Sequence, residues 1–298
     1  EMRHDPKIFH LSTDPPGPLL KEFGAGRIRA TPIAESALTG MAIGAAGSGY
    51  RPIVDWRLVT FCFVAMDQVV NQAAKIHYMF GGQAKFPIVF RTTIGGGTRR
   101  AAQHSQSPYS MFMNLAGLKM IIPSTPYDLK GLLKTAIRDN NPVISFECGR
   151  IGGQMGPVPE EEYTIPLGKA DIKREGSDVT LISTGTQTPR VVDAADILAA
   201  NGIDAHVVHM PTIKPVDVAG VVAAGMSTFA GVLIIISSSM VRDVWIHGLG
   251  RALSPAAELK ANRIMSLAVG VVSLLIALKP PALVLVLTAF SWAVIAST

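Results

Sequence analysis

Cysteine is almost absent from this sequence, since Cys62 and Cys148 are the only two in 298 residues. Two thiols cannot build a disulfide framework, and neither shows the spacing of metal ligands. The sequence also lacks any block of consecutive Lys or Arg residues, so its net charge of +5 does not indicate a nucleic-acid-binding tail. These absences exclude small disulfide-stapled proteins and favour a reducing compartment.

Charged side chains are scarce after residue 218. The charged residues of that stretch are Arg242, Asp243, Arg251, Glu258, Lys260, Arg263 and Lys279. From Ile264 to the end, Lys279 is the only one, which is typical of membrane helices rather than of a globular core. The polar N-terminus shows no secretory signal. We therefore expect a cytoplasmic protein, with membrane association through residues 226–298 as the alternative.

The first 218 residues alternate apolar, β-rich runs with helical patterns. Phe86–Arg91 and Pro142–Phe146 are short apolar strand candidates, and Asp128–Ile137 is an amphipathic helix candidate between them. This alternation predicts an α/β fold with a largely parallel, buried sheet. We expect a first domain over residues 1–150, a connector with a truncated second α/β domain over 151–218, and a hydrophobic helical tail over 219–298.

Four short motifs in the first domain carry most of the functional information. They are Thr31-Pro32-Ile33-Ala34-Glu35, Arg51-Pro52-Ile53-Val54-Asp55, Gln103-His104-Ser105-Gln106 and Ile137-Arg138-Asp139-Asn140-Asn141-Pro142. Their order and spacing resemble the beta subunit of thiamine-diphosphate-dependent pyruvate, acetoin and branched-chain 2-oxoacid dehydrogenases. The resemblance is nearly ungapped from Arg27 to Asn141 and continues more loosely to Asp217. It implies a transketolase-like pyrimidine-binding domain.

The resemblance implies that Glu35 is both catalytic and cofactor-binding. In the family, the matching carboxyl group hydrogen-bonds a ring nitrogen of the cofactor's aminopyrimidine and favours its imino tautomer. Phe61 matches an aromatic residue that stacks on that ring. Arg57, also assigned to the cofactor pocket, stands where several relatives carry an apolar residue. Without the resemblance, Glu35 reads as an acidic residue at a helix N-terminus and Phe61 as a core aromatic.

His104 is the second catalytic candidate. It follows the triple glycine Gly95–Gly97 and lies between polar neighbours. The matching histidine lines the active-site channel in the family, where it stabilises or protonates intermediates and assists acyl transfer to lipoamide. A structural histidine in a loop is the alternative. The glycines match neither a Walker loop nor a dinucleotide fingerprint, so we interpret them as a turn near the substrate.

The family resemblance also implies a potassium site. Ile88, Ala136, Asp139 and Asn141 match positions that hold a monovalent cation in relatives, mainly through backbone oxygens. The alternative for residues 139–141 is a plain Asx-capped turn.

The sequence lacks the Gly-Asp-Gly motif with which the family binds magnesium and the diphosphate. The resemblance therefore implies that an alpha subunit supplies this half of the thiamine diphosphate site, in a heterotetramer of two alpha and two beta subunits. It also implies a lipoyl-bearing acyltransferase and a 2-oxoacid substrate, and the isolated chain is expected to be inactive.

The tail and the activity leave alternatives open. Residues from about 219 resemble a fragment of a sodium:solute symporter, which we interpret as a fusion or reading-frame artefact because so few spans cannot build a transport site. The chain could thus be an inactive membrane-associated chimera. A split transketolase or a deoxyxylulose-phosphate-synthase-type subunit is the other alternative. The motifs at 103–106 and 139–141 favour the dehydrogenase.

Overall fold

The computed structural model describes residues 1–149, 152–224, 241 and 254–278. The chain divides into two compact units, Glu1–Ala224 and Gly225–Thr298. The first unit contains two sheets. The larger has seven strands in the order β10-β5-β6-β4-β3-β1-β2, and the smaller has three in the order β7-β9-β8.

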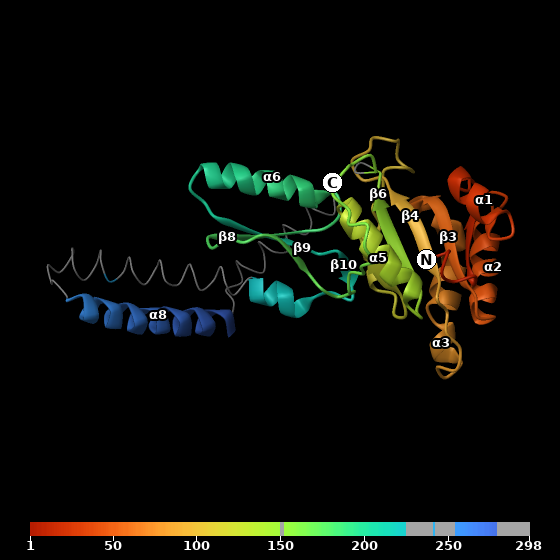
Figure 1. Ribbon diagram of the computed structural model, residues 1–298. Coiled ribbons are helices and arrows are strands. Elements are labelled where there is room, and N and C mark those ends of the chain that lie inside the picture. The colour runs from red at the N-terminus through yellow and green to blue at the C-terminus, as the bar shows by residue number, and fades with distance from the viewer. Residues whose placement is uncertain (150–151, 225–240, 242–253, 279–298) are drawn as a thin grey trace. The chain divides into compact units, whose positions relative to one another are not determined.

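The seven-stranded sheet is parallel except at one edge (Figure 1). Its strands are β1 (Ile8–Ser12), β2 (Ile28–Ala30), β3 (Arg51–Leu58), β4 (Val89–Ile94), β5 (Lys119–Ile121), β6 (Val143–Cys148) and the antiparallel β10 (Thr212–Lys214). The connecting elements are α1 (Gly17–Phe23), α2 (Glu35–Gly47), the 3-10 helix η1 (Val59–Ala65), the π-helical turn η2 (Gln68–Ala73), α3 (Ile76–Met79), α4 (Tyr109–Met113) and α5 (Pro126–Arg138). The predicted α/β fold with a mainly parallel sheet is confirmed.

Successive side chains of the central strands point to opposite faces of the sheet and pack into two separate hydrophobic cores. Val54 and Phe90 pack with α2 and η1, whereas their neighbours Ile53 and Val89 pack with α5. Helices α2 and α5 therefore cover opposite faces of the sheet, as Figure 1 shows. On the α2 side, the ring of Trp56 stacks on that of Phe90 at 4.6 Å. Burial on both faces explains why these strands read as continuous apolar runs.

Helix α5 begins with a capping box. The Thr125 hydroxyl accepts a hydrogen bond from the Asp128 backbone N–H, and the Asp128 carboxylate accepts one from the Thr125 backbone N–H. This pair satisfies donors that a helix N-terminus leaves free. The helix starts two residues before the predicted segment because Pro126 occupies its first turn, where a missing N–H costs nothing.

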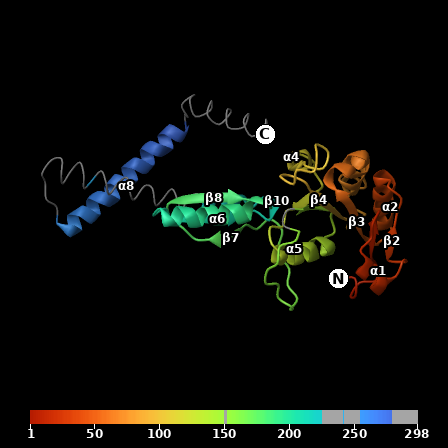
Figure 2. The ribbon, with the colours of Figure 1, turned by 90° about the horizontal axis from the view of Figure 1, so that it is seen from above.

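The three-stranded sheet consists of β7 (Asp171–Arg174), β9 (Ala205–His209) and β8 (Val179–Ser183). Helix α6 (Gln187–Ala200) lies along it (Figure 2). Strand β7 runs antiparallel to β9 and arises from the segment that the sequence pattern assigned to a connector. The truncated second α/β domain predicted over 151–218 therefore includes a three-stranded sheet. Strand β10 instead joins the edge of the larger sheet beside β5.

In the second unit the structure describes helix α8 (Pro255–Leu278). Within the described parts of the chain, no helix is both long enough and apolar enough to cross a membrane. The predicted membrane-like tail thus finds no support there. The remaining predicted tail segments, in 225–240, 242–253 and 279–298, lie outside the described residues.

Candidate active site

Glu35 is the first residue of α2 and is only 7% exposed. The helix dipole favours a negative charge at this end. Beside it, the Ser36 hydroxyl donates a hydrogen bond to the carbonyl of Val64 and so ties the start of α2 to η1. Among the residues that the structure describes, the Glu35 carboxylate has no hydrogen-bond or ion-pair partner. It is therefore free to receive a donor from a ligand.

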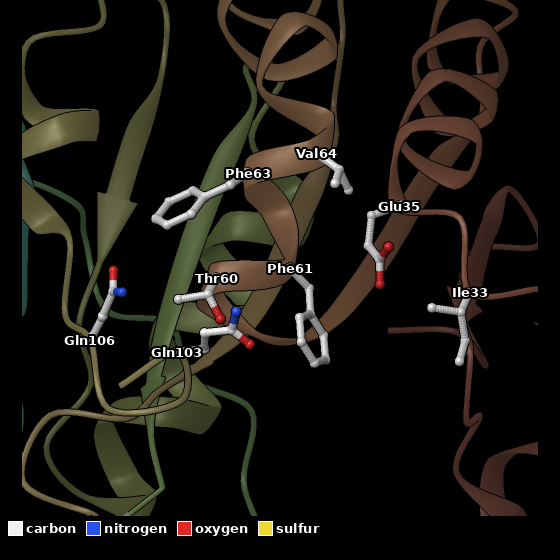
Figure 3. A pocket seen from close by; sticks show the side chains of 8 residues that line it. All are labelled: Ile33, Glu35, Thr60, Phe61, Phe63, Val64, Gln103 and Gln106. Atoms are coloured by element: carbon white, nitrogen blue, oxygen red, sulfur yellow. The ribbon is translucent and has the colours of Figure 1, made fainter. Parts of the chain in front are cut away.

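The Glu35 side chain lines a cavity of about 310 Å³. The lining residues are Ile33, Glu35, Thr60, Phe61, Phe63, Val64, Gln103 and Gln106. Figure 3 shows the Glu35 carboxylate directed toward the side of the cavity where Phe61 lies, with the two glutamines on the far side. A mostly apolar cleft with a few polar groups is the usual form of a small-molecule site.

Phe61 connects the two predicted catalytic residues. It lies on η1 and remains 36% exposed, so its ring is accessible from the cavity. Its edge-to-face contact with His104 has a ring-centroid distance of 5.5 Å and an interplanar angle of 90°. Phe61 thus lines the cavity together with Glu35 and also contacts His104, which is not among the residues that line the cavity.

A tight loop after β4 positions His104. The Gly95 N–H donates to the Gln106 carbonyl at 3.0 Å, and the Arg100 N–H donates to the Ser105 hydroxyl at 2.8 Å. A Cβ at position 95 would lie 1.7 Å from the His104 carbonyl oxygen, so only glycine fits. Nδ1 of His104 is buried and has no hydrogen-bond partner among the described residues.

Comparison with known proteins identifies the family of the chain. Residues 2–149 match the model of the transketolase pyrimidine binding domain, and residues 168–237 match that of the transketolase C-terminal domain. The 2-oxoisovalerate dehydrogenase subunit beta of Bacillus subtilis is 42% identical over 76% of this chain and 73% of the relative. The chain belongs to the family of 2-oxoacid dehydrogenase beta subunits.

Other members of this beta-subunit family are more similar in sequence but longer. The beta subunit of the Bacillus subtilis acetoin:2,6-dichlorophenolindophenol oxidoreductase is 51% identical over 67% of this chain and 58% of the relative. The corresponding protein of Cupriavidus necator is 49% identical over 64% of this chain and 56% of its own length. The chain thus spans little more than half the length of these relatives.

Solved structures show the same fold at lower identity. A split-gene transketolase, described as an inactive beta4 tetramer, matches with a TM-score of 0.64, at 24% identity, over 76% of this chain and 72% of that one. A transketolase from Pichia stipitis matches with a TM-score of 0.54 over 71% of this chain and 33% of that one. The C-terminal-domain match ends at residue 237, further along than the boundary predicted at 218. None of these matches supports the resemblance of the tail to a symporter.

In this family member, Arg57 lies apart from the Glu35 cavity. Its backbone has a left-handed φ of 65°, and its N–H donates to the Asp55 carboxylate at 2.8 Å. Its guanidinium lies 3.2 Å from the carboxylate of Asp14 and faces a neighbouring cavity of about 590 Å³. Phe61 lines both cavities. The sequence placed Arg57 at the pyrimidine pocket, whereas the structure places it on the other side of Phe61.

That neighbouring cavity contains a charged pair that sequence reasoning missed. Arg91 on β4 donates two hydrogen bonds of 2.7 Å to the carboxylate of Glu147 on β6. Burial opposes the charged form of Arg91, but the hydrogen bonds and charge of Glu147 outweigh it and raise the pKa of the guanidinium. The two residues are far apart in the sequence, and only the parallel pairing of β4 with β6 makes them neighbours.

The residues predicted to bind potassium gather near the turn after α5, but their groups already have protein partners. The Ile88 carbonyl accepts from the Val143 N–H at 2.9 Å. Asp139 accepts from Lys119 Nζ at 2.5 Å and from both the backbone and side-chain nitrogens of Asn141 at 2.8 Å. Burial opposes ionisation of Asp139, yet these donors outweigh it and lower the pKa of the carboxyl.

Two further contacts complete this turn. The Asp139 N–H points to the Ala136 carbonyl at 3.3 Å, and the Asp139 carbonyl accepts from the Arg51 guanidinium at 2.7 Å. Together with Lys119, Arg51 places positive charge beside the turn. The potassium site stays a prediction.

Proposed function

We propose that this chain contributes the aminopyrimidine-binding half of a thiamine diphosphate site. In this role it acts as the beta subunit of a dehydrogenase that decarboxylates a 2-oxoacid and transfers the acyl group to lipoamide. One observation carries the proposal: the buried carboxylate of Glu35, without a partner among the described residues, lines a cavity beside the accessible ring of Phe61. The family resemblance of the sequence implies that both side chains match cofactor-binding positions.

The lining of the cavity suits a flat, nitrogen-containing ring. Phe61 offers an aromatic face for offset stacking, and Glu35 offers an acceptor at the ring's edge. The amides of Gln103 and Gln106 can donate or accept on the far side. When bound, thiamine diphosphate supplies the carbon nucleophile that attacks the 2-oxo group. Glu35 would hold the proton on the ring nitrogen that this activation requires.

His104 would work on the substrate side of the same site. Its ring is held against Phe61, and its buried Nδ1 lacks a partner among the described residues. An imidazole so placed can give or take a proton at the oxygen of the reacting carbon. It can also assist acyl transfer to a lipoyl group presented by an acyltransferase partner.

The site requires a second polypeptide in this proposal. No Gly-Asp-Gly motif is present to hold magnesium and the diphosphate, so an alpha subunit would supply them in a heterotetramer with two beta subunits. Residues 1–150 would form the pyrimidine-binding domain, and 151–218 the connector and part of the C-terminal-like domain. A potassium ion would stabilise the turn after α5, held by the predicted ligands Ile88, Ala136, Asp139 and Asn141.

The test is Glu35→Gln in a complex reconstituted with an alpha subunit. Oxidative decarboxylation of pyruvate or a branched-chain 2-oxoacid, followed with a dye as electron acceptor, should fall by about 100-fold or more, because the amide cannot exchange the proton. Glu160→Gln in the exposed connector is the matched control and should retain full activity. Unchanged activity of Glu35→Gln would refute the role of Glu35. Activity on donor ketoses instead of 2-oxoacids would favour a split transketolase.

A further inference from the structure

A second polar cluster lies away from the cavity, where the first turn of α5 meets β7 and β9. Asp128, Asp171 and His209 each offer one ligand atom, and these atoms lie within 4.8 Å of one another. The three residues come from three separate elements. Nothing in the proposed dehydrogenase reaction uses them.

His209 is the unusual member of the cluster. Its side chain is fully buried, and neither ring nitrogen makes a hydrogen bond of ordinary geometry among the residues that the structure describes, although the Ile122 backbone lies close to the ring. Nδ1 lies 3.8 Å from Asp128 Oδ2, too far for a hydrogen bond. A buried imidazole without a well-formed hydrogen bond is costly, and a bound metal ion would remove that cost.

Asp128 presents one oxygen to the cluster while the other is held by the helix cap. Oδ2 accepts from the Ser124 hydroxyl at 2.6 Å and from the backbone N–H groups of Ser124 and Thr125 at 3.1 Å. These hydrogen bonds fix the orientation of the carboxylate, which is only 2% exposed.

Lys173 supplies the cation of this cluster in the structure. Its Nζ lies 2.5 Å from Asp171 Oδ2 and 3.5 Å from Asp128 Oδ1. The ammonium thus lies within ion-pair distance of both carboxylates, and two carboxylates with one ammonium leave one negative charge uncompensated. The Asp171 side chain is 45% exposed, so the ammonium has an open path outward.

We propose that Asp128, Asp171 and His209 form a binding site for a divalent transition-metal ion of the zinc class, from which the Lys173 ammonium is displaced. Zinc bonds of about 2.0–2.2 Å place neighbouring tetrahedral ligands roughly 3.4 Å apart. The three ligand atoms lie within 4.8 Å of one another, so they must close by up to about 1.4 Å on binding. One imidazole and two carboxylates, with water in the fourth position, favour such an ion over magnesium or potassium. The bound metal would fasten the three-stranded sheet to α5.

The test is calorimetric titration of the chelator-treated full chain with zinc, in the presence of excess magnesium and potassium. One zinc ion per chain is expected. Asp171→Asn should weaken binding by about 10–100-fold, because a charged ligand is lost. Asp193→Asn, an exposed carboxylate of α6, is the matched control and should bind as the original chain does. Equal affinity of Asp171→Asn and the original chain would identify zinc binding elsewhere and overturn the proposal, as would an absence of binding.

Lys173→Met separates a metal site from a structural ion pair. If a metal replaces the ammonium, removal of Lys173 should tighten zinc binding by about tenfold, and zinc should raise the melting temperature of this variant. If Lys173 is instead the permanent cation of the cluster, the variant melts lower and zinc does not restore it, which refutes the proposal. Both measurements are independent of catalytic activity, so failure here leaves the test of Glu35 unaffected.

Discussion

Gly95→Ala should disable the proposed site without unfolding the domain. The new Cβ would lie 1.7 Å from the His104 carbonyl oxygen, and real Cβ atoms essentially never approach within 3.0 Å of another heavy atom. The backbone at His104 must therefore retreat by more than about 1 Å, and the contact between His104 and Phe61 cannot survive unchanged. A misplacement of roughly 1 Å at a reacting group costs about 100-fold in rate, or about 2.7 kcal/mol of transition-state stabilisation.

The measurement is kcat for 2-oxoacid decarboxylation by the complex with an alpha subunit, together with the melting temperature of the beta subunit. Gly153→Ala is the control, because a Cβ at that position meets nothing within 4 Å. We expect kcat to fall about 100-fold for Gly95→Ala and to stay unchanged for Gly153→Ala. A Gly95→Ala variant with full kcat would show that the loop adapts freely or that His104 has no part in the reaction.

Two predictions concern stability. Trp56→Ala should cost about 3–5 kcal/mol in urea unfolding, because it empties a fully buried site and breaks both the stacking on Phe90 and the 2.9 Å hydrogen bond from Trp56 Nε1 to Thr39; a loss below about 1 kcal/mol would contradict the packing described. Burial lowers the pKa of His10 to about 4 from an ordinary value of 6.5, so only the unfolded chain gains this proton between those values. Stability should therefore decline as the pH falls from 6.5 toward 4, by up to about 3 kcal/mol from this group. In His10→Gln, urea unfolding from pH 7 to pH 4.5 should show a shallower decline, and an unchanged slope would exclude His10 as its source.

The sequence predicted the elements whose patterns are local. The amphipathic period predicts α5 from Asp128 onward, and the apolar runs predict β4 and β6. The residues next to Glu35 in the sequence also predict that a helix starts there. These features depend on propensity and burial within a few residues, which a single sequence displays directly.

Features that depend on distant partners were not predictable in the same way. The segment Asp67–Met79 reads as one helix, but the structure divides it into a π-helical turn and a short α-helix. Strands β7 and β10 are short and only partly apolar. They form strands because they pair with β9 and β5 at the edges of the two sheets. Arg57 takes a left-handed conformation at a register shift between β3 and β4, and its side chain lines the cavity next to that of Glu35. Each is a case in which tertiary contacts override local preference.

The position of the candidate site follows from the sheet itself. Glu35 follows the carboxyl end of β2, Phe61 that of β3 and His104 that of β4. Parallel strands bring their carboxyl ends to one edge, and in open α/β sheets ligands bind in the crevice outside that edge. Three residues from separate loops can therefore meet without any long-range sequence signal, because the parallel order of β2, β3 and β4 is sufficient. The carboxylate of Glu35 at the start of α2 then lies beside the side chains of η1 that line the same cavity.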